Sequence, residues 1–201
     1  MKYPNGKEYK PTTKDKAKAK KPSAKALLSA GNRGMSFEAD INAANDYYRE
    51  KGICLITKRP TPINVVKVDY SKGAIITNAY FEKQSTTDYN GVLNGRYIDF
   101  EAKSTKQKVS FPLANIPSQQ IEHLTKVLEH GGIAFFLIRF EELGEVYLLD
   151  AKYVIDFHTK HKRKSIPLNL IKEVGMEIKY GLNPRLNYIS AVKKKYARKL
   201  K

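Results

Sequence analysis

Apolar residues recur every three or four positions in two stretches of the chain, which is the spacing of an amphipathic helix. The first stretch begins at Ser36, a residue type that caps helices, and runs to about Lys51. The second covers residues 118–130 and ends at two consecutive glycines. Further helices are expected from Ala151 and over residues 186–199. These segments predict the helical part of the fold.

Extended segments separate the helices. Residues 133–140 form a nearly continuous apolar run, as a buried central strand does, and residues 146–150 are expected to pair with it. A short apolar strand is expected at residues 53–57, with the single cysteine buried in it. Residues 59–81 contain two β-branched runs on either side of Ser71-Lys72-Gly73, which predicts a hairpin. The order of elements predicts one α/β domain, a mixed sheet flanked by helices.

Polar and apolar residues alternate cleanly between Arg96 and Lys103, directly after the strong hairpin-turn signal Asn94-Gly95. On a strand this alternation places two sets of side chains on opposite faces. The apolar face would carry Ile98, Phe100 and Ala102, and the polar face would carry Tyr97, Asp99, Glu101 and Lys103.

A candidate for chemistry lies on this polar face. A hairpin can bring Asp88 from the preceding strand next to Glu101, and two carboxylates together make a site for a hard cation such as Mg²⁺. Lys103 shares the face of Glu101 and can stabilise charge on a phosphate, while Thr86 can add a hydroxyl. The same residues also fit a solvated, salt-bridged surface hairpin, so the pattern by itself leaves both interpretations open.

Charge is distributed unevenly along the chain. The 201 residues include 37 Lys and Arg against 20 Asp and Glu, a formal net charge of +17. Residues 1–34 carry +8 and residues 193–201 carry +6, so the remainder is nearly balanced at +3. We therefore expect a disordered basic tail over 1–31, a domain over 32–192 and a second basic tail over 193–201. A protein this basic usually binds a polyanion, most commonly nucleic acid.

Composition excludes several other classes of protein. No apolar run of 18 residues occurs, so no membrane association by a spanning helix is expected. The N-terminus lacks the apolar stretch of a secretory signal, and the lone Cys54 excludes an internal disulfide; both fit a cytoplasmic protein. His158 and His161 have no matching ligand pair, so contact between phosphate and the basic loop around them, including Lys162 and Arg163, is favoured over zinc.

Several blocks of sequence, in order, resemble the RecU-type Holliday-junction resolvases of Gram-positive bacteria. The blocks cover residues 32–42, 58–66, 85–106, 111–124 and 183–189. The resemblance implies the restriction-endonuclease-like nuclease core, a homodimer, and Mg²⁺-dependent nicking of two strands across four-way junction DNA in recombination and repair. It also implies a stalk formed by the hairpin 59–81, with Lys72 at its tip, and binding to the strand-exchange recombinase.

The resemblance also implies roles for individual residues. Asp88 and Glu101 would bind metal and act in catalysis, with Thr86 and Gln120 completing the metal site and Lys103 stabilising the transition state. Of the neighbouring Gln119 and Gln120, the family pattern favours the second. Supporting or DNA-facing roles are expected for Arg33, Glu38 and Asp99.

Two other functions remain alternatives. One is a sequence-specific endonuclease of linear duplex DNA on the same core. The other is a non-catalytic basic DNA-binding or recombination-accessory protein whose site is degenerate. The complete set of Asp88, Glu101 and Lys103 argues against degeneracy.

Overall fold

A computed structural model of the chain describes residues 36–81 and 86–200. The expected basic tail 1–31 and Arg33 lie outside these residues. The described elements belong to one unit, Met35–Lys201. None of its helices is both long and apolar enough to cross a membrane.

A six-stranded sheet forms the centre of this unit, with strand order β1-β4-β5-β7-β8-β10. Its strands are β1 (Leu55–Lys58), β4 (Tyr89–Leu93), β5 (Arg96–Thr105), β7 (Ile133–Phe140), β8 (Glu145–Asp150) and β10 (Met176–Glu177). Strands β5 and β7 are parallel, whereas the other neighbouring pairs are antiparallel. The predicted α/β class with a mixed sheet is therefore confirmed.

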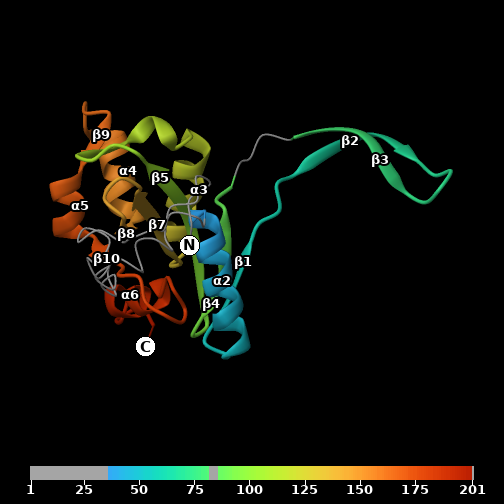
Figure 1. Cartoon of the computed structure of the whole chain (residues 1–201). Coiled ribbons are helices and arrows are strands. Elements are labelled where there is room, and N and C mark those ends of the chain that lie inside the picture. The colour runs from blue at the N-terminus through green and yellow to red at the C-terminus, as the bar shows by residue number, and fades with distance from the viewer. Residues whose placement is uncertain (1–35, 82–85, 201) are drawn as a thin grey trace, which may run out of the picture. The chain divides into compact units, whose positions relative to one another are not determined.

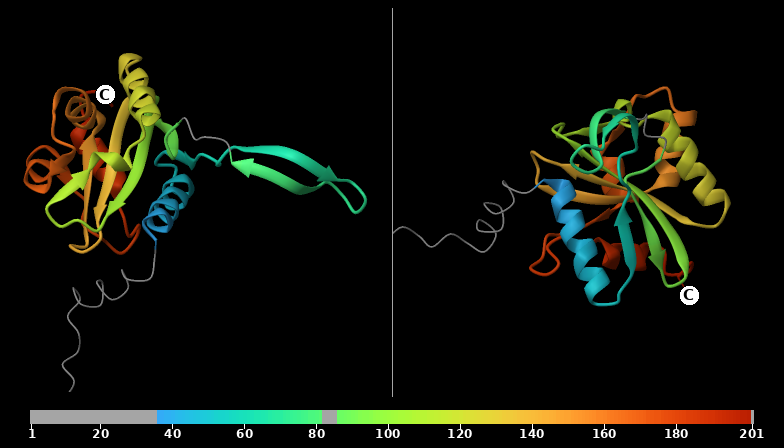
Figure 2. Two further views of the ribbon diagram at one scale, coloured as in Figure 1. Left: turned by 90° about the horizontal axis from the view of Figure 1, so that it is seen from above. Right: turned by 90° about the vertical axis from the view of Figure 1, so that its right-hand side faces the viewer.

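Helices cover both faces of the sheet (Figure 1 and Figure 2). They are α2 (Phe37–Glu50), α3 (Ser118–Glu129), α4 (Ala151–Lys160), α5 (Leu168–Val174) and α6 (Tyr188–Lys195). Side chains of α2 and α6 share a core with Phe100 and Phe135, whose rings stack at 4.7 Å. Side chains of α3, α4 and α5 pack on the alternate residues of β7, such as Phe136. β7 is buried on both faces, as its apolar run predicted.

The turn between β4 and β5 has the conformation that its sequence predicted. Asn94 and Gly95 both have positive φ, at 49° and 75°, as a two-residue hairpin turn requires. Further along β4, Gly91 faces Ile56 of β1, and a Cβ at Gly91 would lie 2.0 Å from the carbonyl oxygen of Leu55. Only glycine allows β1 and β4 to approach this closely, and β4 carries the candidate site at its start.

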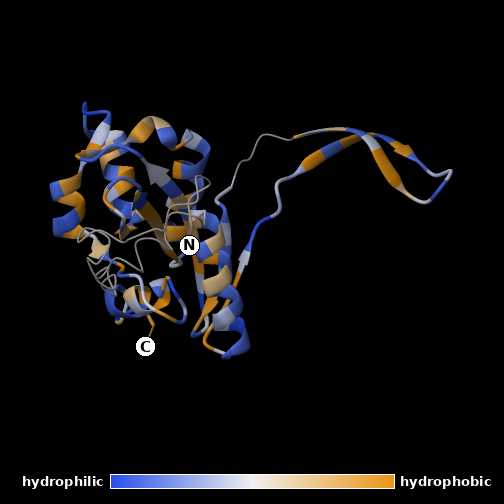
Figure 3. Ribbon diagram, viewed as in Figure 1, coloured by the Kyte–Doolittle hydropathy of each residue, from blue (hydrophilic) through white to orange (hydrophobic). Residues whose placement is uncertain are grey.

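The hairpin predicted within residues 59–81 is confirmed as the antiparallel pair β2 (Ile63–Asp69) and β3 (Ile75–Phe81). It forms its own two-stranded sheet, and nearly all of its side chains are exposed. Figure 3 shows that apolar residues occupy much of both strands even so. The hairpin therefore stands apart from the two cores of the domain.

Other elements differ from the sequence-based expectations. The strand expected at 53–57 is β1, which begins two residues later than predicted. Cys54, expected to be buried in the strand, instead precedes it and is only partly buried. The pair β6 (Ser110–Pro112) and β9 (Ser165–Pro167), the 3₁₀ turn η1 (Leu113–Asn115) and α5 were not anticipated. In the segment 193–200, expected as a tail, the first three residues end α6 and a turn follows. The segment packs on the domain, because Tyr196 is buried and its hydroxyl donates to the carbonyl of Ala134.

Candidate active site

The carboxyl groups of Asp88 and Glu101 come from neighbouring strands of the sheet. Asp88 directly precedes β4, and Glu101 lies in the middle of β5. The β4–β5 register pairs Tyr89 with Phe100, so Asp88 lies across from Glu101. The backbone N–H of Asp88 donates to Glu101 Oε2 at 3.0 Å. The structure thus has the adjacency that the strand alternation predicted.

Two further side chains converge on the carboxylate of Glu101, which is fully buried. Lys103, two residues on along β5, places its Nζ 2.5 Å from Glu101 Oε1. Gln120, in the first turn of α3, donates from Nε2 to the same oxygen at 2.8 Å. Of the two neighbouring glutamines, Gln120 makes this contact, as the family pattern favoured.

Burial is the main influence on the ionisation of Glu101. The pKa of this carboxyl is raised from 4.5 to about 7: desolvation is the largest cause, the Lys103 ammonium opposes it, and the charge of Asp88 adds to it. Near neutral pH, Glu101 therefore changes easily between its protonated and ionised forms. A second cation beside the two carboxylates would favour the ionised form.

The site fits a divalent cation that prefers oxygen ligands. The amide oxygen of Gln120 is buried with no hydrogen-bond partner among the described residues, which a cation would supply. Within 36–81 and 86–200 no cluster of three or more His, Cys, Asp or Glu is close enough to hold a metal. A metal here would thus need neutral oxygens beside Asp88 and Glu101, and Thr86, partly buried two residues before Asp88, is placed in sequence to add one.

Asp99 forms a second cluster on the same face of β5, two residues before Glu101. It is fully buried, and it accepts hydrogen bonds from four side chains: Arg59 Nη2 at 2.8 Å, Tyr97 OH at 2.7 Å, His123 Nε2 at 2.9 Å, and the Thr87 hydroxyl. This burial favours the supporting role over the DNA-facing one, since a fully buried side chain does not face DNA.

Sequence reasoning did not identify Arg59 and Thr87 as parts of the site. Both lie in blocks that carry the family resemblance, 58–66 and 85–106, which was the only available signal. Neither residue follows a helical or strand periodicity that would connect it with Asp99.

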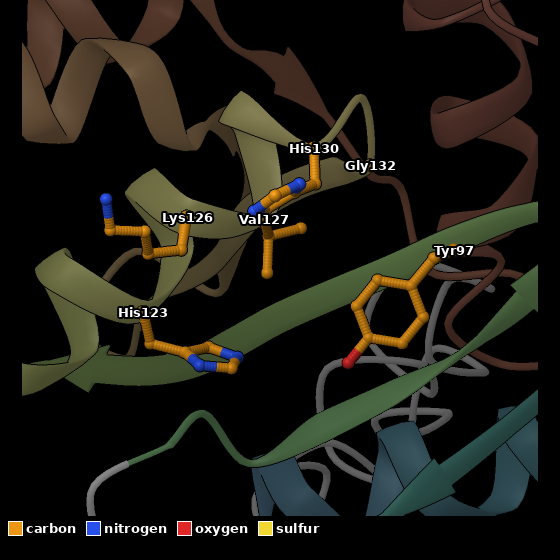
Figure 4. A pocket seen from close by; sticks show the side chains of 6 residues that line it. All are labelled: Tyr97, His123, Lys126, Val127, His130 and Gly132. Atoms are coloured by element: carbon orange, nitrogen blue, oxygen red, sulfur yellow. The ribbon is translucent and has the colours of Figure 1, made fainter.

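A pocket of about 380 Å³ opens beside the Asp99 cluster (Figure 4). It is lined by Tyr97, His123, Lys126, Val127, His130 and Gly132. Figure 4 shows the Tyr97 ring, from β5, and the His123 ring, from α3, pointing toward the same region. Both rings are hydrogen-bonded to Asp99, so one wall of the pocket is fixed by a buried carboxylate.

The remaining candidates lie at the surface. Glu38, on α2, forms an exposed ion pair with Lys58, and its negative charge contributes to raising the pKa of Tyr89 next to Asp88. Lys72 is exposed between β2 and β3, away from the carboxylates. Lys162 and Arg163 are exposed between α4 and β9, where Arg163 lines a separate hollow of about 290 Å³.

The domain is thus a mixed α/β fold in which Asp88 lies across from Glu101, and Lys103 follows Glu101 on the same strand. The family described as "RecU: Recombination protein U" matches residues 32–194. The match covers most of the chain, and the protein belongs to this family.

Individual relatives agree with this assignment. A protein of Geobacillus sp. (strain WCH70) named "Holliday junction resolvase RecU" is 52% identical over 98% of both chains. A protein of the same name from Lactococcus lactis subsp. cremoris (strain SK11) is 48% identical over 96% of both. The solved structure of Archaeoglobus fulgidus Hjc, described as a Holliday junction resolvase, matches 68% of this chain at 12% identity with a TM-score of 0.38. That last likeness is too distant to support an argument.

Proposed function

We propose that this protein is a metal-dependent endonuclease that resolves four-way (Holliday) DNA junctions during recombination and repair. The observation that carries the proposal is the buried carboxylate of Glu101, which is contacted by Lys103, by Gln120 and by the backbone of Asp88. Membership of the Recombination protein U family, with relatives named as resolvases, identifies the junction as the substrate.

The cofactor that we propose is Mg²⁺, held by Asp88 and Glu101 with the oxygens of Gln120 and Thr86. Mg²⁺ favours oxygen ligands, and when bound it would polarise the scissile phosphate and lower the pKa of a coordinated water. Two carboxylates and two neutral oxygens are ligands of the kind that Mg²⁺ prefers, and water and phosphate would supply the remaining ones.

The residues of the chain have separate tasks in the hydrolysis of a phosphodiester. Water forms the new bond to phosphorus as the bond to the leaving oxygen breaks, and negative charge grows on the non-bridging oxygens. The Lys103 ammonium, which contacts Glu101 and is partly exposed, would stabilise this charge. Burial of Glu101 limits competing water and keeps that ion pair strong.

Resolution of a junction requires two nicks in symmetric positions, so we propose that the protein acts as a homodimer with two sites facing one junction. The basic residues 1–31 and the hairpin 59–81 would add contacts to DNA, and the recombinase that exchanges strands is a further partner. A chromosomal substrate and a single cysteine fit activity in the cytoplasm.

The decisive experiment compares cleavage of a synthetic four-way junction, a linear duplex and a single strand, with and without Mg²⁺. Wild type should nick the junction in a Mg²⁺-dependent manner, and Lys103→Ala should lose this activity while still binding the junction. Lys172→Ala, which removes a lysine from α5, is the matched control and should cleave normally.

Two outcomes would replace the proposal with an alternative. Cleavage of linear duplex at defined sequences, without preference for junctions, would indicate a sequence-specific endonuclease. Junction binding with no cleavage under any metal condition would indicate an accessory DNA-binding protein.

A further inference from the structure

Arg59 connects the two segments that join the β2–β3 hairpin to the main sheet. The chain enters the hairpin through Arg59, directly after β1, and rejoins the sheet through Asp88, directly before β4. The backbone N–H of Arg59 donates to the carbonyl oxygen of Asp88 at 2.8 Å, which extends the β1–β4 ladder by one residue. The backbone that presents the Asp88 carboxylate is therefore bonded to Arg59.

The side chain of Arg59 bonds to Thr87, which directly precedes Asp88, and to two residues of β5. Its Nη1 donates to Thr87 Oγ1 at 2.8 Å and to the Thr87 carbonyl at 3.3 Å. Its Nη2 donates to Asp99 Oδ2 and to Tyr97 OH, each at 2.8 Å. Both terminal nitrogens are thus engaged within the protein, and the side chain is only 19% exposed.

Asp99, at the other end of these hydrogen bonds, is held in the middle of the sheet. Asp99 lies on β5, which is paired on both sides, with Asn90 of β4 and with Ala134 of β7. Its carboxylate also receives the Tyr97 hydroxyl and a ring nitrogen of His123, the two side chains that point toward the same part of the pocket in Figure 4. A carboxylate held from several directions in the centre of a sheet is a fixed anchor.

Two consecutive residues, Thr87 and Asp88, connect this anchor to the proposed metal site. Thr87 and Asp88 are consecutive, and Asp99 and Glu101 are two apart on one face of β5. The Thr87 hydroxyl donates to Asp99 and the backbone N–H of Asp88 donates to Glu101, so two consecutive residues are each bonded to a carboxylate of β5. Because Thr87 and Asp88 are joined by one peptide bond, holding Thr87 in place restricts the position of Asp88.

From these contacts we infer that Arg59 is a positioning residue for the metal site: by joining Thr87 to Asp99 it holds Asp88 against Glu101. The inference rests on the proposed function, because it assigns Asp88 and Glu101 to a bound cation. Partners that orient metal ligands typically change metal affinity 10- to 100-fold when they are removed. A direct role of Arg59 in DNA binding is not favoured, because its terminal nitrogens already bond to protein groups.

The test measures metal binding apart from cleavage. Arg59→Ala should raise the Mg²⁺ concentration for half-maximal junction cleavage about tenfold or more. It should also shrink the rise in melting temperature that Mg²⁺ causes in DNA-free protein, while junction binding in EDTA stays within about twofold of wild type. Arg59→Lys keeps a positive charge at Asp99 but loses the second terminal nitrogen that donates to Thr87. Its Mg²⁺ concentration for half-maximal cleavage should therefore fall between those of wild type and Arg59→Ala.

A second variant tests the inference even if Arg59→Ala does not fold. Thr87→Val is nearly isosteric and removes only the hydroxyl between Arg59 and Asp99, so it should shift the Mg²⁺ dependence in the same direction in a folded protein. Arg49→Ala, which removes an exposed arginine from α2, is the matched control and should behave as wild type.

Two results would overturn the inference. One is an unchanged Mg²⁺ dependence in both Arg59→Ala and Thr87→Val. The other is a loss of junction binding in EDTA that fully accounts for the lost cleavage, which would make Arg59 a DNA contact. If wild type itself cleaves no junction, the proposed function fails, but the Mg²⁺-induced melting shift still tests the position of Asp88.

Discussion

Asp99 and Glu101 are two buried carboxylates on the same face of one strand, and their surroundings differ. Asp99 accepts hydrogen bonds from four side chains, including the Arg59 guanidinium, so its charge is well compensated. Glu101 has the Lys103 ammonium but also faces Asp88, and its pKa is raised to about 7. Two residues apart, one carboxylate is compensated by hydrogen bonds within the fold, and the other is the one that we propose to bind a cation.

The largest effect should come from removing charge at the Glu101 cluster. We expect Asp88→Asn to reduce the rate of junction cleavage about 10³-fold or more, since a bound metal supplies several kcal/mol to the transition state. Because Asp88 is partly exposed, the substitution should change the protein's free energy of unfolding in urea by less than about 1 kcal/mol. Gel-based cleavage at saturating Mg²⁺ and urea titration measure the two quantities. Wild-type cleavage by this variant would remove Asp88 from the catalytic assignment.

The opposite result is expected at the Asp99 cluster. Asp99→Ala leaves Arg59, which is only 19% exposed, without its buried carboxylate partner, and this should lower the free energy of unfolding by about 3–5 kcal/mol. Urea unfolding at pH 7.5 measures this loss, with Arg49→Ala as a control that should lose less than about 1 kcal/mol. If Asp99→Ala were as stable as the control, the comparison between the two carboxylates would break down.

The dependence of stability on pH sharpens the comparison further. Because the folded pKa of Glu101 lies near 7, above its ordinary 4.5, this group favours the metal-free folded state below about pH 4.5. That contribution, of order 3 kcal/mol, is lost as the pH rises through 7. Mg²⁺ should therefore raise the melting temperature more at pH 8 than at pH 6.

Asp88→Asn is the control for this measurement, because it removes one carboxylate from the proposed metal site. It should abolish most of the Mg²⁺ effect at both pH values. An equal Mg²⁺ effect at pH 6 and pH 8 in wild type would mean that Glu101 does not hold the cation.

The smallest effects are expected outside both clusters, at the basic loop between α4 and β9. If Lys162 or Arg163 contacts phosphate, each alanine substitution should weaken junction binding severalfold and reduce the salt dependence by about one counterion. The Mg²⁺ requirement for cleavage should not change. Binding measured over a series of salt concentrations checks this, and an unchanged slope would exclude the loop from the interface.

Local patterns were sufficient to predict the longer elements and the strand face that carries the proposed site. The alternation from Arg96 to Lys103 and the turn at Asn94-Gly95 placed Glu101 and Lys103 on one face, because strand periodicity is a local property. Arg59 was missed because its partner Asp99 is forty residues away, and only the folded register brings them together. A basic residue in a basic chain gives no signal of such a contact.

Short and highly charged segments were predicted less well. The three-residue strands β6 and β9 and the seven-residue α5 are too short for periodicity to identify. In residues 193–200 the lysines suggested a tail, but Tyr196 and Leu200 pack on the core that includes Phe135. Two apolar contacts outweigh the charge of the segment, since lysines can keep their ammonium groups in water.

The exposed hairpin has a consequence for how the protein behaves in concentrated solution. In the described part of the chain β2 and β3 pair only with each other, so each keeps an open edge, and Val66, Tyr70 and Phe81 are each at least 60% exposed. The net charge of +17 keeps copies apart at low ionic strength, and this repulsion is screened by salt. Salt added to release bound nucleic acid during purification should thus promote edge-to-edge association of hairpins. We therefore expect the hairpin to limit the salt and protein concentrations at which the protein stays dispersed.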